Sequence, residues 1–203
     1  KGEIHFAGAL ENNEDTGTLQ YLASTAMEVG FSTRVLDMQA LDLQNGRFFD
    51  PAGELVNRCF KLYPWEWMVD ESPDGCLAEM EWLEPIWKLV MSNKAILATL
   101  YELFPDSPYV LPCYLSRPRS GLFCKKPVFS REGHNVSVVD IRDWEEYVRI
   151  AETEGDYNTG AYVYQEYVEP TAYSGRYPVI GSWIIGGEAA GIGIRENRME
   201  VTD

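Results

Sequence analysis

The order of secondary-structure patterns over residues 4–37 is the feature that most limits the fold of this chain. Residues 4–10 are apolar, and residues 18–30 then place apolar side chains at helical spacing, with Gly30 ending the pattern. Residues 31–37 have the pattern of a second strand. A strand, a helix and a strand in this order predict a βαβ unit with parallel strands. We therefore expect a mixed α/β fold whose functional loop follows the first strand.

The loop that would follow the first strand, residues 11–15, is acidic and ends in Glu14 and Asp15. One interpretation is that these carboxylates only begin the helix, where the helix dipole stabilises negative charge. The other interpretation is an acidic pocket for an amine, which makes Glu14 and Asp15 candidate substrate-binding residues.

Residues 47–56 predict a hairpin with a type I turn at residues 50–53. Residues 59–68 then gather three large aromatic side chains around Lys61 and Glu66. Such a cluster is typical of a core, although a ligand cage has the same composition. Both charged side chains need partners if they are buried.

Residues 76–104 have a helical pattern that is broken at Pro85. Ser92 and Asn93 are suited to cap a helix over residues 94–103. After Pro105 the sequence pattern changes to that of turns and short strands, and we expect a subdomain boundary in this part of the chain.

The second half of the chain is predicted to be mainly β-structure. Residues 123–128 and 136–141 predict an antiparallel hairpin around the loop of residues 129–135. Three further elements are expected: an amphipathic helix over residues 143–154 with Trp144, Tyr147, Val148 and Ala151 on its apolar side, a strand over 161–168, and a hairpin of 177–185 and 189–195 that turns at Gly186 and Gly187.

Charge is distributed unevenly along the sequence. The chain has a net charge of −15, yet residues 115–135 carry five Lys or Arg against one acidic residue, whereas residues 1–114 and 136–203 have net charges of −11 and −8. A cationic segment between two anionic segments concentrates one anion while the outer surface repels extended polyanions. We therefore expect a small phosphate ligand and no nucleic acid.

Composition predicts a soluble globular protein. No run of about 20 apolar residues is present to span a membrane, and the first residues lack the apolar core of a signal peptide, so we expect a cytoplasmic protein. The four cysteines are widely spaced and are expected to be reduced thiols. Because the sequence lacks an initial Met and stops directly after a predicted strand, we expect a fragment truncated at both ends.

A lysine on a strand, followed by a glycine-containing hairpin loop, is suited to hold an oligophosphate. Lys126 fits the first role, because its ammonium group can meet the phosphate oxygens as a point charge. The amides of the loop can close over the distal phosphate, and its candidate residues are Ser130, Arg131, Glu132 and Gly133. Lys94 from a neighbouring helix would share the charge. The alternative is that both lysines are solvated surface residues.

The segment Gln165, Glu166, Tyr167 and Val168 leaves an apolar strand and offers the donors and acceptors that an adenine edge and ribose hydroxyls require. An edge strand with one polar face is the alternative. Arg195 follows a glycine-rich hairpin and is suited to stabilise phosphoryl charge, whereas a salt bridge to Glu196 or Glu200 would explain it structurally.

Several of these segments, taken in order, resemble the glutathionylspermidine synthase family of ATP-grasp ligases. The similar segments are residues 92–97, Lys126-Pro127 with Arg131-Glu132-Gly133, Tyr164-Gln165-Glu166, and residues 181–195, with residues 63–66 and the Glu14-Asp15 loop in the expected places. The glycine-rich hairpin that ends in Ile194-Arg195-Glu196 is the most distinctive of them. The similarity covers nearly the whole chain.

The resemblance implies an ATP-dependent acid–amine ligase that works through an acyl phosphate. Residues 1–90 would then be a βαβ substrate-side region resembling a pre-ATP-grasp domain, and residues 91–203 an ATP-grasp nucleotide-binding subdomain. The candidate ATP residues are Lys94, Lys126, Ser130–Gly133 and Gln165–Val168, with Val201 and Thr202 beside the nucleotide. Arg195 would face the reacting phosphate.

The same resemblance implies small-molecule partners, a carboxylate donor such as a glutathione-like peptide and an amine acceptor such as a polyamine, and it leaves the acid, the amine and the oligomeric state unspecified. In this family the Mg²⁺ ligands lie upstream of the matched region, so no metal ligand is assigned in this chain. We accordingly expect the chain alone to lack ligase activity. The alternatives are an ATP-grasp peptide ligase with another substrate pair and a nucleotide-binding or scaffold module without catalysis.

Overall fold

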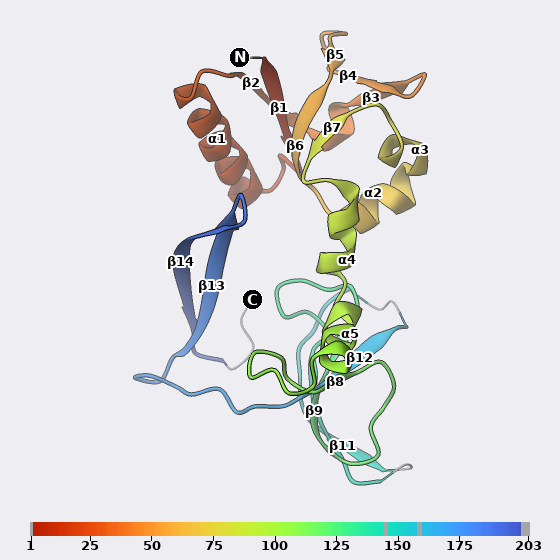
Figure 1. Cartoon of the computed structure of the whole chain (residues 1–203), viewed down its shortest axis with the longest axis vertical. Helices are drawn as coiled ribbons and strands as arrows, with labels where there is room; N and C mark the ends of the chain where they lie inside the picture. Colours follow the sequence, from red (N-terminus) through yellow and green to blue (C-terminus); the bar gives the residue numbers. More distant parts are fainter. Residues whose placement is uncertain (1, 144–145, 158–159, 200–203) are drawn as a thin grey trace. The chain divides into compact units, whose positions relative to one another are not determined.

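The computed structural model describes residues 2–143, 146–157 and 160–199 of the chain (Figure 1). Its internal contacts divide the chain into two compact units, Lys1–Val90 and Met91–Asp203.

The first unit is built on a four-stranded sheet in the order β2-β1-β6-β7, and its three strand pairs are all parallel. The strands are β1 (Glu3–Gly8), β2 (Ser32–Asp37), β6 (Arg58–Leu62) and β7 (Glu81–Leu83). Helix α1 (Asn13–Glu28) connects β1 to β2. The predicted βαβ unit is therefore confirmed, and the carboxyl ends of β1, β2 and β6 share one edge of the sheet.

A second, antiparallel sheet of three short strands belongs to the same unit: β3 (Asp42–Gln44), β4 (Arg47–Phe49) and β5 (Leu55–Val56). The predicted hairpin between residues 47 and 56 is confirmed by the pairing of β4 with β5. The remaining helical segments that lie in this unit or end just beyond it are short: η1 (Met38–Ala40), α2 (Trp65–Glu71), α3 (Pro73–Cys76), η2 (Ile86–Lys88) and α4 (Leu89–Ser92).

The helical pattern expected from residue 76 onward is wrong for its first part, because Glu81–Leu83 form strand β7. The buried Trp82 explains the difference. Its ring contacts Phe48 and Trp65 edge to face at centroid distances of 5.6 Å, and its backbone pairs with Cys59 on β6. Pairing with the sheet and aromatic packing together outweigh a helical pattern that is weak over so few residues.

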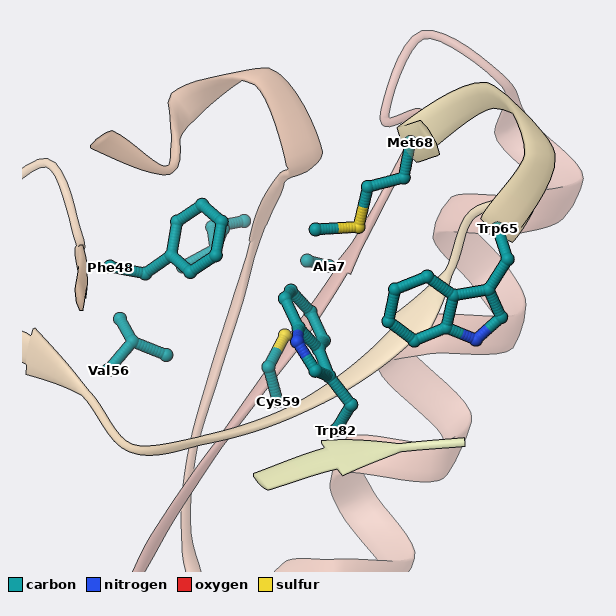
Figure 2. Packing of buried hydrophobic residues seen from close by; sticks show 8 residues of the cluster. Ala7, Phe48, Val56, Cys59, Trp65, Met68 and Trp82 are labelled. Atoms are coloured by element: carbon teal, nitrogen blue, oxygen red, sulfur yellow. The ribbon is translucent and has the colours of Figure 1, made fainter. Parts of the chain in front are cut away.

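The core of the first unit lies on both faces of the parallel sheet. Leu19 and Ala23 of α1 pack on one face against Ile4 and Phe6 of β1. Figure 2 shows the other face, where Trp65, Met68 and Trp82 form one cluster with Cys59. Sheets of parallel strands are normally covered on both faces, and this one follows the rule.

The rings near Lys61 belong to this core, and the lysine is bound within it. Lys61 is 8% exposed; its Nζ donates to the carbonyl of Tyr63 at 2.6 Å and lies 3.9 Å from the centroid of the Trp65 ring. Trp65 and Tyr63 of the cluster therefore belong to the core and bind its buried cation, as one of the two interpretations expected, whereas Trp67 is 40% exposed.

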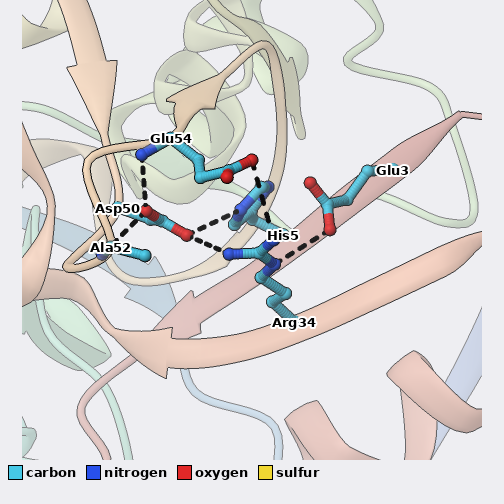
Figure 3. Close-up of polar contacts among 6 residues, drawn as sticks. All are labelled: Glu3, His5, Arg34, Asp50, Ala52 and Glu54. Carbon is cyan, nitrogen blue, oxygen red and sulfur yellow. Dashed lines mark hydrogen bonds and ion pairs between the residues drawn. The ribbon is translucent and has the colours of Figure 1, made fainter.

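A polar network joins β1, β2 and the β4–β5 turn (Figure 3). The buried carboxylate of Asp50 accepts hydrogen bonds from the amides of Ala52 and Glu54 and from Arg34 Nη1 at 2.5 Å. Arg34 Nε also donates to Glu3. The imidazole of the buried His5 lies with its Nε2 3.9 Å from Asp50 Oδ2. The hydrogen bonds to Asp50, first that from Glu54, lower the pKa of its carboxyl group, whereas burial lowers the pKa of His5.

The second unit contains a five-stranded antiparallel sheet in the order β11-β10-β9-β12-β8. The strands are β8 (Cys113–Tyr114), β9 (Gly121–Pro127), β10 (Ser137–Ile141), β11 (Tyr147–Glu152) and β12 (Tyr162–Glu166). Helix α5 (Ala95–Leu103) packs on the sheet through Ala98, which contacts the core formed by Cys113 and Val163. The hairpin predicted around residues 129–135 is confirmed as β9 and β10.

The amphipathic helix expected over residues 143–154 is wrong, because the structure has the edge strand β11 there. Tyr147–Glu152 are all exposed, so no apolar helix face is needed. Before the strand, Asp143 Oδ1 accepts a hydrogen bond from the Glu146 amide at 2.8 Å. The unpaired edge of β10 then supplies backbone partners to a segment rich in β-branched and aromatic residues. Trp144, part of that expectation, lies outside the described residues.

Strands β13 (Tyr177–Ile185) and β14 (Glu188–Asn197) form a two-stranded ribbon. They turn at Gly186 and Gly187, whose φ angles of 60° and 84° lie in the left-handed region that glycine favours. This hairpin was predicted and is confirmed. Among the described residues no other strand pairs with it, and its large apolar side chains are exposed.

All four cysteines are free thiols, as predicted. Burial raises the pKa of Cys59 to about 12, so this thiol stays protonated at neutral pH. None of the described helices is long and apolar enough to cross a membrane.

Candidate functional site

The loop between β9 and β10, residues 129–135, is fixed at both ends but leaves backbone donors open. Glu132 and Gly133 have φ angles of 52° and 67°, and the His134 amide donates to the Arg131 carbonyl at 2.9 Å, which closes a tight turn. None of the described residues accepts a hydrogen bond from the amides of Ser130, Glu132 or Gly133. Open amides in a turn of left-handed residues are suited to bind an anion.

The second end of this loop is held by the segment after β11. Asn135 Nδ2 donates to the Gly155 carbonyl at 2.8 Å, and Asn135 Oδ1 accepts from the Tyr157 amide at 2.7 Å. Gly155 has no Cβ and therefore packs against His134, since an added Cβ would lie 2.4 Å from the His134 Cβ. The loop is consequently positioned before any ligand binds.

Lys94 holds the first end of the same loop. Its Nζ donates to the Ser130 carbonyl at 2.5 Å and to Ser130 Oγ at 2.9 Å, and its amide donates to the Val128 carbonyl. Ser130 is buried in this contact. Asn93 Oδ1 accepts from the Ala95 amide and so caps α5, as predicted. The ammonium group of Lys94 therefore lies at the loop, where the phosphate role was expected.

Lys126 and Gln165 lie on adjacent strands and contact each other. Lys126 Nζ donates to Gln165 Oε1 at 2.7 Å. Both residues share the sheet face of Val163, the face on which α5 packs. The structure thus brings together Lys94, Lys126, the loop and Gln165, which are far apart in the sequence.

The chain leaves β12 immediately after Gln165 and Glu166. The amides of Glu166 and Tyr167 donate to the carbonyls of Pro112 and Leu122 at 2.8 and 3.0 Å. Val168 is 58% exposed, and no described residue is hydrogen-bonded to its backbone. The backbone of Val168 is thus exposed beside Glu166, and the assignment of this segment to an adenine and ribose site stays a prediction.

Arg195 lies on the ribbon, opposite Val179 of β13, and its side chain is exposed. Among the described residues it forms no ion pair; the Glu196 carboxylate lies 4.0 Å from Arg176 instead. The phosphate role of Arg195 therefore stays a prediction. Val201 and Thr202 lie outside the described residues.

Glu14 and Asp15 belong to the first unit and form the first turn of α1. Asn12 caps this helix, because its Oδ1 accepts from the amides of Glu14 and Asp15 at 2.9 and 3.4 Å. The acidic start of the helix is confirmed by this geometry. The amine-binding interpretation stays a prediction, placed at the edge of the sheet where parallel strands end.

A pocket of about 170 Å³ in the first unit was not predicted. It lies beyond the end of β2, where Met38, Gln39 and Leu41 meet Tyr63 and Glu71. The Tyr63 hydroxyl donates to Glu71 Oε2 at 2.6 Å, and burial together with this carboxylate raises the pKa of Tyr63 to about 12. Tyr63 was part of the aromatic cluster in the sequence, but Glu71, eight residues later at the end of α2, carried no signal.

No group of three or more His, Cys, Asp or Glu side chains suited to a metal ion occurs among the described residues. The described part of the chain therefore offers lysines and amides for the phosphates, but no cluster of ligands for Mg²⁺.

The model of the glutathionylspermidine synthase pre-ATP-grasp family matches residues 1–203. The chain belongs to this family. The resemblance inferred from the sequence motifs is thereby confirmed.

The chain is also similar to three curated proteins. It is 33% identical to "Putative acid--amine ligase" of Haemophilus influenzae, over 100% of this chain and 54% of that protein. It is 28% identical to the trypanothione synthetase of Crithidia fasciculata and 26% identical to the bifunctional glutathionylspermidine synthetase/amidase of Escherichia coli, over 99% and 90% of this chain and 34% of each relative. The chain thus spans about half the length, or less, of these relatives.

A crystal structure of the D-cycloserine synthetase DcsG has the same fold over much of the chain. The TM-score is 0.51 at 15% sequence identity, and the match covers 89% of this chain and 64% of that one. This likeness and the mixed sheets confirm the α/β class.

Proposed function

We propose that this chain is part of an ATP-dependent acid–amine ligase that forms an amide through an acyl phosphate. The observation that carries the proposal is the cluster in the second unit, where Lys126, bonded to Gln165, lies beside a loop with open amides. Membership of the family and the names of the relatives support it.

In the proposed reaction ATP supplies its γ-phosphoryl group to the carboxylate of the acid, and the amine nitrogen then displaces phosphate and loses a proton. Lys126 neutralises phosphate charge, and its present partner Gln165 is released or shared when the anion binds. The amides of Ser130, Glu132 and Gly133 bind the distal phosphate. Lys94 keeps the loop in place through Ser130.

Gln165, Glu166, Tyr167 and Val168 bind the adenosine part, with Val168 offering its open backbone edge. Arg195 stabilises the phosphoryl charge that develops in the reaction, and Val201 with Thr202, outside the described residues, is assigned to the same nucleotide site. The ligase chemistry also requires Mg²⁺. Because the described residues include no ligand cluster for it, we derive no step through this ion.

The first unit would serve the substrate side. The carboxylates of Glu14 and Asp15 at the start of α1 are suited to an amine of the polyamine type, and the acid would be a glutathione-like peptide. A Glu14→Gln change should then raise the KM for the amine several-fold and leave the affinity for ATP unchanged. An unchanged KM would favour the simple helix-start role.

The decisive experiment is calorimetric titration of the full-length protein with ATP and magnesium, followed by mass analysis of products formed from glutathione and spermidine. Binding with amide formation supports the ligase. Nucleotide binding without product from these or other acid and amine pairs would favour the non-catalytic module. We also expect residues 1–203 alone to release no phosphate above background.

A further inference from the structure

The basic segment of the sequence has lysine side chains on both faces of the five-stranded sheet. Lys125 and Lys126 are consecutive on β9, so their side chains point to opposite faces. Lys126 pairs with Val163 on the α5 side, whereas Lys125 pairs with Tyr164 and Ser137. The function proposed above uses Lys126 and leaves Lys125 without a role.

A half-enclosed cavity of about 90 Å³ lies on the Lys125 face. Its floor is apolar, formed by Val139 and Ile141 of β10, which are 1% and 2% exposed. Polar side chains from four other segments surround this floor: Arg117 before β9, Lys125 of β9, Tyr147 of β11 and Tyr164 of β12. No carboxylate is among the described residues that line the cavity.

Both cations of the cavity lie over tyrosine rings and form no ion pair with a described residue. Arg117 Cζ is 4.9 Å from the centroid of the Tyr147 ring, and Lys125 Nζ is 3.9 Å from that of Tyr162. Arg117 Nη2 donates to the carbonyl of Asp143 at 3.1 Å, while its buried Nε has no acceptor among the described residues. Among the described residues, neither cation has a carboxylate partner, although the protein has a net charge of −15.

The tyrosines add hydroxyl donors to this charge. Burial raises the pKa of Tyr164, although the nearby Arg117 opposes the shift, so the phenol keeps its proton at neutral pH. A protonated phenol can donate a hydrogen bond to an anion, and the two cations beside it repel a cationic ligand.

The size of the cavity limits the ligand. A single water needs about 10–15 Å³ of such space, so 90 Å³ holds a group of several heavy atoms. Sites for drug-sized ligands are about 300–1,000 Å³, so a nucleotide does not fit. An apolar floor below two cations matches a short aliphatic chain that ends in a carboxylate.

We propose that Arg117, Lys125 and Tyr164 form a second binding site, specific for a small aliphatic carboxylate, on the sheet face opposite Lys126. The carboxylate pairs with Arg117 and Lys125 and accepts a hydrogen bond from Tyr164, while its alkyl chain covers Val139 and Ile141. The site is independent of the proposed nucleotide site, although both are built on β9 and β12.

The test uses propionate as the probe and its uncharged isostere propionamide as the matched ligand control. Titration of the isotope-labelled full-length protein, followed by amide chemical shifts, should show saturable changes at Lys125, Val139 and Tyr164 with propionate. We expect propionamide to bind at least tenfold more weakly, because it lacks the charge.

Two neighbouring variants give the protein control. Lys125→Gln should lower the affinity for propionate at least tenfold and leave the affinity for ATP unchanged. Lys126→Gln should lower the affinity for ATP and leave the affinity for propionate unchanged. Tyr164→Phe, which removes one hydroxyl group only, should weaken propionate several-fold; it also tests the site if Lys125→Gln fails to fold.

Equal binding of propionate and propionamide would overturn the proposal, as would a loss of propionate binding in Lys126→Gln alone. Saturable binding of inorganic phosphate without propionate would also overturn the carboxylate assignment. Because ATP affinity is measured separately, failure of this site and failure of the proposed nucleotide site are distinguishable.

Discussion

The two central sheets of this protein use their polar groups in opposite ways. Beside the parallel sheet of the first unit, the Asp50 carboxylate in the β4–β5 turn accepts three hydrogen bonds, from Arg34 of β2 and from the amides of Ala52 and Glu54. In the antiparallel sheet of the second unit, the amides of Ser130, Glu132 and Gly133 have no acceptor among the described residues.

This difference separates stability from binding. Polar groups that hydrogen-bond to one another within a fold contribute to its free energy of unfolding. Removing one of them leaves its buried partner without a hydrogen bond, because water cannot reach it. Open donors that are already positioned contribute little to folding and lower the cost of ordering a site around a ligand. Substitutions in the two sheets should therefore change different measurements.

The largest effect should come from the core of the first unit. Trp82→Ala removes the edge-to-face contacts with Phe48 and Trp65, and we expect it to lower the free energy of unfolding by about 3–5 kcal/mol. Urea unfolding measures this loss, with Trp87→Ala, an exposed tryptophan, as the control that should stay within about 0.5 kcal/mol. Equal losses in both variants would contradict the core assignment.

The next effect concerns the ribbon, which has neither a core nor a described ion pair for Arg195. Arg195→Ala in the full-length protein should lower turnover about 10²-fold while ATP affinity changes much less, because the charge it meets is greatest in the transition state. Steady-state kinetics and calorimetry give the two values. Arg176→Ala, directly before β13, is the control, and equal losses in turnover and affinity would show ground-state binding instead.

Lys126→Ala tests the open donors of the second sheet. We expect ATP affinity to fall about 10- to 100-fold, the usual loss of a charged hydrogen bond, with an unchanged melting temperature. Lys88→Ala, which removes a lysine paired with Glu84 in the first unit, should leave ATP affinity unchanged. A lowered melting temperature with normal ATP affinity would assign Lys126 to folding.

The smallest effect should be the pH dependence of the first unit. Burial lowers the pKa of His5 in the folded state, so below the usual value of 6.5 the unfolded chain binds more protons and stability falls as the pH falls. Asp50, whose pKa is also lowered, loses its contribution only below its usual 3.8. Unfolding titrations between these two values should therefore give a shallower pH dependence for His5→Gln than for the natural chain; identical profiles would contradict this role of His5.

The sequence predicted the elements whose pattern is local. The βαβ unit follows from helical spacing between two apolar segments, and the ribbon follows from Gly186 and Gly187 between alternating strands. Residues 143–154 and Trp82 were misjudged because their structure depends on a partner strand that spacing alone does not reveal. The count of charged residues likewise marked Lys125 and Lys126 as one basic segment, although the two side chains lie on opposite faces of β9.

The candidate site was predictable only as a set of residue types. Lys126 and the glycine-containing loop carry a recognisable chemistry, but the bond between Lys126 and Gln165 and the bond between Lys94 and Ser130 arise from strand order and helix docking. Glu71 beside Tyr63, and Arg117 beside Tyr147, are tertiary pairs without a sequence pattern.

The alternation of Lys125 and Lys126 also limits how the gene can change in length. Inserting or deleting one residue within β9 would turn every later side chain of that strand to the other face. Inserting or deleting one codon between the start of β9 and Lys125 would thus exchange the faces of Lys125 and Lys126. It would also turn Pro127 out of its buried position. Substitution can alter either lysine independently, but a viable change of length in this strand requires two residues at once.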